Sequence, residues 1–343
     1  MTDGERRVRE IGEFALIAEL ETALPAAARG GSAVALGIAD DAAIWCPTSG
    51  IPCVVTTDTL VEGIHFRLDW TDWRSLGHKA LAVNLSDCAA MGAAPILATV
   101  SLGLDGDERV VDVRAMYKGM GELAAAHGVI VAGGDIVRSP YALVITITVI
   151  GECRSGAPLR RSGARPGDAI AVSGTLGAAA AGLRLLAADA SRTAATADLL
   201  IGAQLRPQPR IALGQVLAAG GASAAMDLSD GLSGDLPKLL VASGASGRID
   251  LAHLPVAAAV RALFPDDWRD LALHGGEDYE LLFTASPERL EAIRAAAGAI
   301  GATVTAIGRV QPGGNAPEPL LVVNPDGSEL FLTPAAFDHF RES

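Results

Sequence analysis

The chain has 343 residues, of which 50% are apolar and 20% are charged, and its formal net charge is −13. This length fits two domains, and the apolar fraction is enough to form a core, so a largely disordered chain is excluded. The negative charge argues against a protein that binds nucleic acid or an anionic membrane through a basic face.

Helices and strands are expected to alternate along the first half. Helical spacing of apolar residues predicts three helices, at 12–24, 73–95 and 108–128. Apolar and β-branched runs predict strands at 32–45, 51–58, 129–135 and 141–152. The turn-rich segment 160–168 then marks a joint. We assign residues 1–152 to an N-terminal domain and residues 153–343 to a C-terminal domain.

The second half repeats this alternation. Apolar runs predict strands at 169–174, 278–285, 302–310 and 319–324, and helices at 175–190 and 287–301. Between them, a short strand leads into "MDLSDG" (226–231) and then into the helical pattern "LSGDLPKLL". The fold class is therefore α/β or α+β, with two domains.

The four cysteines contain no C-x-x-C pair; they are Cys46, Cys53, Cys88 and Cys153. We expect them to be buried as small apolar residues in a reducing compartment rather than to bind zinc or form disulfides. The first residues lack the apolar core of a signal peptide, and the apolar run 141–151 is too short to span a bilayer as a helix. We therefore expect a cytoplasmic protein.

Carboxylates recur beside runs of small or apolar residues. These acids are Asp40, Asp41, Asp58, Asp135, Asp227 and Asp230, and Asp87 lies on a predicted helix. Acids at strand ends meet at one edge of a sheet, where α/β folds place ligands, so we expect them to converge. We expect no basic residue to pair with Asp227 or Asp230. Any single one could instead be a helix N-cap, as for Asp41 or Asp230.

A converging set of carboxylates predicts bound cations. Two carboxylates about 4 Å apart repel by roughly 4 kcal/mol at an effective dielectric constant near 20. Oxygen ligands without His or Cys nearby favour Mg²⁺, Mn²⁺ or Ca²⁺ over Zn²⁺. An EF-hand is excluded because no loop has acids at alternate positions. The sequence also lacks a P-loop, a G-x-S-x-G motif and the protein-kinase motifs.

Several motifs together resemble the thiamine-monophosphate kinase family of the aminoimidazole-ribonucleotide-synthetase-like superfamily. They are "GIADDAAI", "TTDTLVEGIHF", "NLSDCAAMGA", "VAGGD", "MDLSDGLSGDL" and "GGEDYEL", and they keep their order over nearly the whole chain. The resemblance implies an N-terminal domain that pairs with its twin in a homodimer, and a C-terminal α/β domain that covers the active-site groove. It also implies ATP-dependent phosphorylation of thiamine monophosphate to thiamine diphosphate, the last step of thiamine diphosphate biosynthesis, with several Mg²⁺ ions.

The resemblance also assigns roles to residues. The metal ligands would be Asp41, Thr56, Thr57, Asp58, Asp87, Asp135, Asp227 and Asp230, with Asp40 as a cap or a second layer. The residues at the reacting phosphates would be Asp58, Asp87, Asp135 and Asp230. ATP would contact Gly134, Asp135, Arg161 and Ser229. Thiamine monophosphate would contact His65, Glu277 and Phe337. The acceptor phosphate is largely ionised at neutral pH, so we expect direct in-line transfer with no phospho-enzyme.

Other interpretations remain open for single residues and for the whole chain. His65 and Phe337 could be core residues, and Arg161 could form a salt bridge at the joint. Ala39, Ile136 and Val137 replace a glycine and two hydroxyl residues that the family usually has. A selenophosphate-synthetase-like or hydrogenase-maturation relative would need a reactive Cys in an N-terminal glycine-rich loop or at the C-terminus. A module that binds Mg²⁺ and ATP without turnover is the rival from another class.

Overall fold

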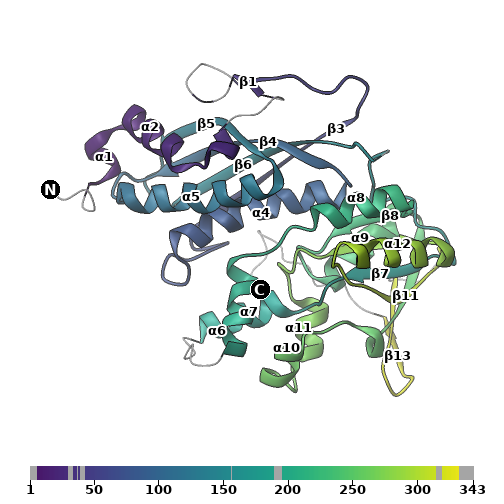
Figure 1. The fold of residues 1–343 in the computed structure, drawn as a ribbon. Coiled ribbons are helices and arrows are strands. Elements are labelled where there is room, and N and C mark those ends of the chain that lie inside the picture. Colours follow the sequence, from purple (N-terminus) through teal and green to yellow (C-terminus); the bar gives the residue numbers. More distant parts are fainter. Residues whose placement is uncertain are drawn as a thin grey trace. The chain divides into compact units, whose positions relative to one another are not determined.

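The computed structural model describes residues 6–29, 34–36, 38, 43–155, 157–188, 195–313 and 319–331. The chain forms two compact units (Figure 1). The first unit holds the residues up to Cys88 together with Ala94–Arg154. The second holds Ala89–Ala93 and the residues from Ser155 onward.

A four-stranded sheet forms the centre of the first unit. Its strands are β3 (Cys53–Val61), β6 (Val144–Glu152), β4 (Ala94–Leu104) and β5 (Ile130–Arg138), in that order across the sheet. The β4–β5 pair is parallel, and the other two pairs are antiparallel. Figure 1 shows α4 (Trp73–Ala90) and α5 (Val110–His127) along this sheet. Strand residues such as Val100, Ile147 and Val149, which share one face, are buried.

Two glycines allow α4 and α5 to pack in backbone contact. A Cβ on Gly77 of α4 would lie 1.9 Å from the carbonyl oxygen of Met116. A Cβ on Gly119 of α5 would lie 1.9 Å from the carbonyl oxygen of Arg74. No larger side chain fits at either position, so the crossing of the two helices is fixed by sequence. The bidentate ion pair of Arg74 with Glu122 adds a polar contact between the helices.

The other elements of the first unit are short, apart from one helix. They are α1 (Val8–Ile11), α2 (Glu13–Ala23), α3 (Ala26–Arg29), β1 (Val34–Leu36) and β2 (Ile44–Trp45). β1 and β2 pair with each other and pack, through Val34 and Trp45, against Leu97, Ile130 and Ile150 of the large sheet. They cover one end of the sheet face that points away from Val100 and Ile147. Towards the other end, Thr57 and Thr59 are exposed.

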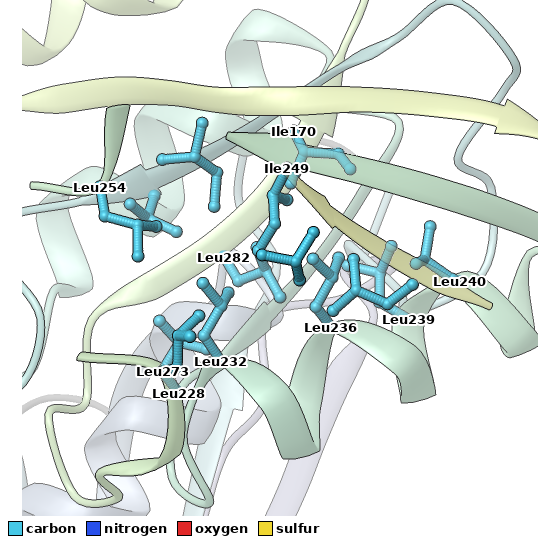
Figure 2. Close-up of a cluster of buried hydrophobic side chains, with 14 of the residues drawn as sticks. Ile170, Leu228, Leu232, Leu236, Leu239, Leu240, Ile249, Leu254, Leu273 and Leu282 are labelled. Carbon is cyan, nitrogen blue, oxygen red and sulfur yellow. The ribbon is translucent and has the colours of Figure 1, made fainter. Parts of the chain in front are cut away.

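The second unit is built on a seven-stranded sheet. Its order is β13 (Glu329–Phe331), β12 (Leu320–Val323), β9 (Ala245–Asp250), β11 (Val304–Pro312), β7 (Ala169–Ser173), β10 (Leu281–Ala285) and β8 (Ala224–Asp227). Only the β12–β9 pair is parallel among these strands. The helix α9 (Leu232–Ala242) packs on the sheet. Figure 2 shows Leu236 and Leu239 of this helix beside Ile249 and Leu282 of the strands.

The remaining helices of the second unit form two groups. α8 (Ile211–Gly220) packs against α12 (Pro287–Ala299). α6 (Ala178–Ala187), α7 (Ala195–Leu205), α10 (Ala258–Leu263) and α11 (Trp268–His274) share a small core that includes Ala181, Leu200, Val260 and Leu271. A short 3-10 helix spans Leu251–His253.

The predicted helices at 12–24, 108–128 and 287–301 are confirmed. The strand predicted at 32–45 is wrong as a single element, because β1 and β2 are separate short strands. The helix predicted at 73–95 ends at Ala90, and Pro95 already belongs to β4, a strand that the sequence patterns did not predict. No helix of the described residues is both long and apolar enough to cross a membrane.

The cysteines divide into two pairs. Cys88 and Cys153 are buried, as expected. Cys46 and Cys53 are exposed, so the expectation of burial is wrong for these two. Cys53 is the first residue of β3, where the strand still runs at the surface.

Candidate active site

Asp58 and Asp87 form a carboxylate pair between β3 and α4. Asp58 lies in the middle of β3, not at its end as expected, and its backbone pairs with Ile147 on β6. Burial, and then the nearby Asp87, raise the pKa of Asp58 to about 6. Thr56 lies two residues earlier on the same face of β3, and its hydroxyl donates a hydrogen bond to Oδ2 of Asp87. Two carboxylates and a hydroxyl oxygen are thus gathered at one place.

Asn84 holds this part of the site in place. Its Oδ1 accepts a hydrogen bond of 3.0 Å from the backbone N–H of Asp58, and its Nδ2 donates to the carbonyl oxygen of Ala80 at 3.1 Å. Asn84 is fully buried and lies three residues before Asp87, on the same side of α4. Sequence reasoning missed this residue, although the spacing in "NLSD" predicts that Asn84 and Asp87 share a helix face.

Thr57 points to the other face of the sheet. Its hydroxyl donates to the carbonyl oxygen of Ile147 at 3.1 Å and accepts from the hydroxyl of Thr148 at 3.1 Å. Because successive strand residues alternate between faces, the Thr57 side chain lies away from Asp58 and Thr56. The expected row of ligands Thr56, Thr57 and Asp58 is therefore divided between two faces.

Asp135 does not join the Asp58–Asp87 pair within one chain. Asp58 shares a row across the sheet with Ile147, Val100 and Gly134, so Gly134 is three strand spacings from Asp58, about 14 Å. Asp135 belongs to the next row and points to the opposite face. It also lies within β5 rather than at its end. The expected convergence of Asp135 with Asp58 and Asp87 is therefore wrong for a single chain.

Gly134 has a structural reason to be glycine. A Cβ at this position would lie 1.8 Å from the carbonyl oxygen of Val100 on β4. A Cβ on the neighbouring Gly133 would have no such atom within 4 Å. The close approach of β5 to β4 at Gly134 therefore depends on the missing side chain.

His65 lies in the turn that follows β3. Its Nδ1 accepts a hydrogen bond of 3.1 Å from the backbone N–H of Val61, and the backbone N–H of His65 donates to the carbonyl oxygen of Val61 at 2.9 Å. The turn is closed by a bond of 2.8 Å from the N–H of Gly63 to the carbonyl oxygen of Phe66. Because Nδ1 accepts, it carries no proton, and the imidazole ring is held in one orientation.

In the second unit, a buried carboxylate holds the turn that carries Ser229 and Asp230. Asp227 ends β8, as predicted, and is buried. Oδ2 of Asp235, in the first turn of α9, accepts the backbone N–H groups of Ser229 at 3.0 Å and Asp230 at 2.9 Å. Asp235 is fully buried, and sequence reasoning missed it. Its position in the first turn of a helix was the available signal.

Asp230 has a cationic partner, which corrects the expectation that it has none. Nζ of Lys238 lies 2.5 Å from Oδ2 of Asp230 and 2.9 Å from Oδ1 of Asp235. Lys238 lies three residues after Asp235 on α9, so the two side chains share one face of the helix, and the ammonium group reaches back to the start of the helix. Lys238 was the second residue that sequence reasoning missed in this unit.

Glu277 lies beside the same turn. Its backbone N–H donates to the carbonyl oxygen of Ser229 at 2.8 Å, and the N–H of Tyr279 donates to that of Leu228 at 2.9 Å. A Cβ on Gly276 would lie 2.6 Å from the carbonyl oxygen of Ser229, so only glycine permits this approach. The carboxylate of Glu277 accepts a hydrogen bond from Nε2 of Gln204 on α7. The second unit therefore unites Asp227, Ser229, Asp230 and Glu277.

Four expected residues have other outcomes. Arg161 is exposed, and within the described part of the chain its guanidinium forms no ion pair. Asp41 and Phe337, and with them Asp40, lie outside the described residues. In the described ranges, no three His, Cys, Asp or Glu side chains are grouped closely enough to hold a metal ion.

Comparison with known proteins identifies the family. Residues 39–153 match the N-terminal domain of AIR synthase related protein, and residues 165–316 match its C-terminal domain. The thiamine-monophosphate kinase of Escherichia coli strain K12 is 41% identical over 336 residues, which are 96% of this chain and 98% of that protein. The chain belongs to the thiamine-monophosphate kinase family.

Two solved structures of relatives agree with this family. The thiamine-monophosphate kinase of Stenotrophomonas maltophilia K279a is 39% identical, has a TM-score of 0.81, and covers 93% of this chain and 98% of its own. AaThiL, solved in complex with AMPPCP and TMP, is 33% identical, has a TM-score of 0.76, and covers 98% and 99% of the two chains. The resemblance to the thiamine-monophosphate kinase family is therefore confirmed, as is the mixed fold of two AIR-synthase-related domains.

The Asp58–Asp87 pair of this thiamine-monophosphate kinase family member has the chemistry of a hard-cation site. All of its donors are oxygens, from Asp58, Asp87 and Thr56, and none is nitrogen or sulfur. Burial, and then the nearby Asp87, raise the pKa of Asp58, so a negative charge on Asp58 is unfavourable there, and a bound cation would offset this cost. These residues therefore fit a divalent cation with oxygen ligands.

Proposed function

We propose that this chain catalyses the ATP-dependent phosphorylation of thiamine monophosphate to thiamine diphosphate, the last step of thiamine diphosphate biosynthesis. The observation that carries the proposal is the relation to AaThiL, which was solved with AMPPCP and TMP and covers 98% of this chain. AMPPCP is an ATP analogue that cannot transfer its terminal phosphoryl group. A complex with it represents a nucleotide and an acceptor held together before transfer.

We further propose that Mg²⁺ is the cofactor and that Asp58, Asp87 and Thr56 hold at least one ion. When bound, Mg²⁺ neutralises phosphate charge and so lowers the repulsion between two polyanions. The sheet and Asn84 fix the backbone of Asp58, so its carboxylate is in place before a ligand arrives. Asp41, Thr57, Asp135, Asp227 and Asp230 remain proposed ligands of further ions.

The other residues would bind and orient the two substrates. Ser229 lies on a turn fixed by Asp235, and Arg161 has an exposed guanidinium suited to a phosphate. Gly134 and Asp135 are proposed as the remaining nucleotide contacts. We assign His65, Glu277 and Phe337 to thiamine monophosphate. The acceptor phosphate is already ionised near neutral pH, so transfer would be direct and would need no phosphorylated side chain.

A homodimer and a cytoplasmic location complete the proposal. The sheet face that carries Thr57 and Thr59 also carries Val55 and Val137, which are 67% and 50% exposed. Exposed apolar residues on this sheet face support an interface with a second copy. Light scattering on the purified protein tests the dimer, and a monomer at assay concentrations would contradict it.

The decisive experiment follows thiamine diphosphate by chromatography after the addition of ATP, Mg²⁺ and thiamine monophosphate. Asp58→Asn is measured in parallel, with Asp112→Asn, which removes the half-buried carboxylate that pairs with Arg109, as the control. We expect product from the wild type and from Asp112→Asn, and a loss of at least about 100-fold in kcat/KM for Asp58→Asn. ATP binding without any product would favour the module that binds Mg²⁺ and ATP without turnover.

A further inference from the structure

The backbone around Asp278 is held in an unusual conformation. Glu277 has φ +67° and Tyr279 has φ +49°, and they are the only non-glycine residues with positive φ in the described part of the chain. L residues avoid this left-handed region, so something in the surrounding structure must hold the two residues there. The residue between them is Asp278, for which the proposed function has no use.

The side chain of Asp278 is tied to the start of α6. Its Oδ2 accepts the backbone N–H of Gly177 at 2.6 Å, and its Oδ1 accepts that of Ala179 at 3.1 Å. The first N–H groups of a helix have no partner within the helix, and the positive end of the helix dipole favours a carboxylate there. Gly177, the N-cap of α6, offers no side chain of its own. Asp278 supplies the missing cap from 101 residues away in the sequence.

The same helix also helps to place the partner of Glu277. A Cβ on Gly182 of α6 would lie 2.1 Å from the carbonyl oxygen of Leu200 on α7, so the two helices pack in backbone contact. Gln204 of α7 donates the hydrogen bond to the Glu277 carboxylate. The contacts therefore close a ring that runs from Asp278 to α6, then to α7, and through Gln204 back to Glu277.

Gln204 alone does not fix the loop. Its Oε1 is buried and has no hydrogen-bond partner among the described residues. The side-chain amide of Gln204 therefore contributes to the loop through the bond from its Nε2 to Glu277. The backbone bonds of Glu277 and Tyr279 to residues 228 and 229 hold the loop on its other side. The bonds from Asp278 to the start of α6 add a third support next to residue 277.

We propose that Asp278 is a positioning residue that aims Glu277 at the acceptor substrate by anchoring its loop to the N-terminus of α6. This inference rests on the proposed function, in which Glu277 contacts thiamine monophosphate. Asp278 itself touches neither substrate. Its loss should therefore weaken the binding of the acceptor and leave the binding of ATP largely unchanged.

The test compares Asp278→Asn with the wild type in steady-state kinetics with each substrate varied. The amide keeps the shape but removes the charge and turns one acceptor into a donor. We expect KM for thiamine monophosphate to rise about 10-fold, as for other residues that orient a ligand-binding group. We expect KM for ATP to change less than about 2-fold. Asp250→Asn, which removes a carboxylate that caps the 3-10 helix through Ala252, is the matched control and should leave both constants unchanged.

A double-mutant cycle separates positioning from general damage. In the Glu277→Gln background, Asp278→Asn should add little to KM for thiamine monophosphate, because both changes act through one side chain. Asp278→Ser, which keeps a short acceptor, replaces Asp278→Asn if the latter does not fold. Equal effects on both KM values, or full additivity in the cycle, would overturn the proposal. No turnover by the wild type would instead overturn the proposed function.

Discussion

Asp58 and Asp135 lie in one four-stranded sheet, on its opposite edges and its opposite faces. Asp58 faces α4, where Asp87 and Asn84 accompany it. Asp135 faces the side that carries Thr59 and Thr146. One copy of the first unit therefore presents two separate acidic surfaces, and the proposed dimer would cover the one that carries Asp135.

Asp58→Asn should stabilise the metal-free protein at alkaline pH. The pKa of Asp58 is raised from 3.8 to about 6, so its contribution to stability is present below about pH 4 and is lost as the pH rises through 6. At about pH 8 the ionised Asp58 carboxylate, which is largely buried and lies near Asp87, costs up to about 3 kcal/mol. In EDTA, we expect the Tm of Asp58→Asn to exceed that of the wild type at about pH 8, with the difference vanishing near pH 4. An equal difference at both pH values would show that the charge is not its cause.

Gly134→Ala should destabilise the first unit, whereas Gly133→Ala should not. The added methyl group at residue 134 meets the carbonyl oxygen of Val100 and forces β5 away from β4. We expect a loss of about 1–3 kcal/mol in the free energy of unfolding from this overpacking. At residue 133 the same methyl group meets nothing within 4 Å, so a change within about 0.5 kcal/mol is expected. Urea unfolding measures both, and equal losses would contradict the close approach at Gly134.

Lys238→Met should lower stability through Asp235. The buried Asp235 carboxylate would keep its two backbone N–H donors but lose its ammonium partner. A loss of about 1–3 kcal/mol is expected for a buried charge without its partner. Arg294→Met removes an exposed pair with Glu291 and should cost less than about 0.5 kcal/mol. Thermal unfolding of the two variants gives the comparison, and a neutral Lys238→Met would mean that Asp235 does not need the cation.

The cysteines should differ sharply in their reaction with iodoacetamide. Burial, and then Asp87 and Cys153, raise the pKa of Cys88 to about 12, so almost no thiolate forms at about pH 8. Cys46 and Cys53 are exposed and should be alkylated in the native protein. Mass spectrometry of tryptic peptides locates the label, and unfolded protein labelled at all four positions is the control. Rapid native labelling of Cys88 would mean that its helix opens readily.

Sequence patterns predicted most elements but not the centre of the first sheet. β4 carries "APILATVSLGL", a nearly continuous apolar run that neither alternates nor follows helical spacing. Its residues are buried on both faces for much of its length, because helices lie along one face and β1 and β2 pack on part of the other (Figure 1). A strand in this position gives no periodic signal. Without β4, the order of the strands could not be predicted from the sequence.

The arrangement of the acids follows only in part from the sequence. The acids Asp58, Asp87 and Asp230 do lie beside other polar groups. The expectation that strands end at the acids failed because β3 and β5 continue beyond Asp58 and Asp135. Asn84 and Asp235 hold the backbone of the site residues through hydrogen bonds. These bonds depend on tertiary contacts, which the spacing of residues in the sequence indicates only weakly.

The three acids of "GGEDYEL" join three different parts of the second unit. Glu277 meets Gln204 of α7, Asp278 meets the start of α6, and Glu280 is buried against Arg210 and Ser173. The conformation of this loop therefore depends on contacts with the surrounding residues rather than on its own seven residues. If the segment alone were grafted onto another protein, it would keep its sequence but lose its conformation, because the residues that hold it would be missing.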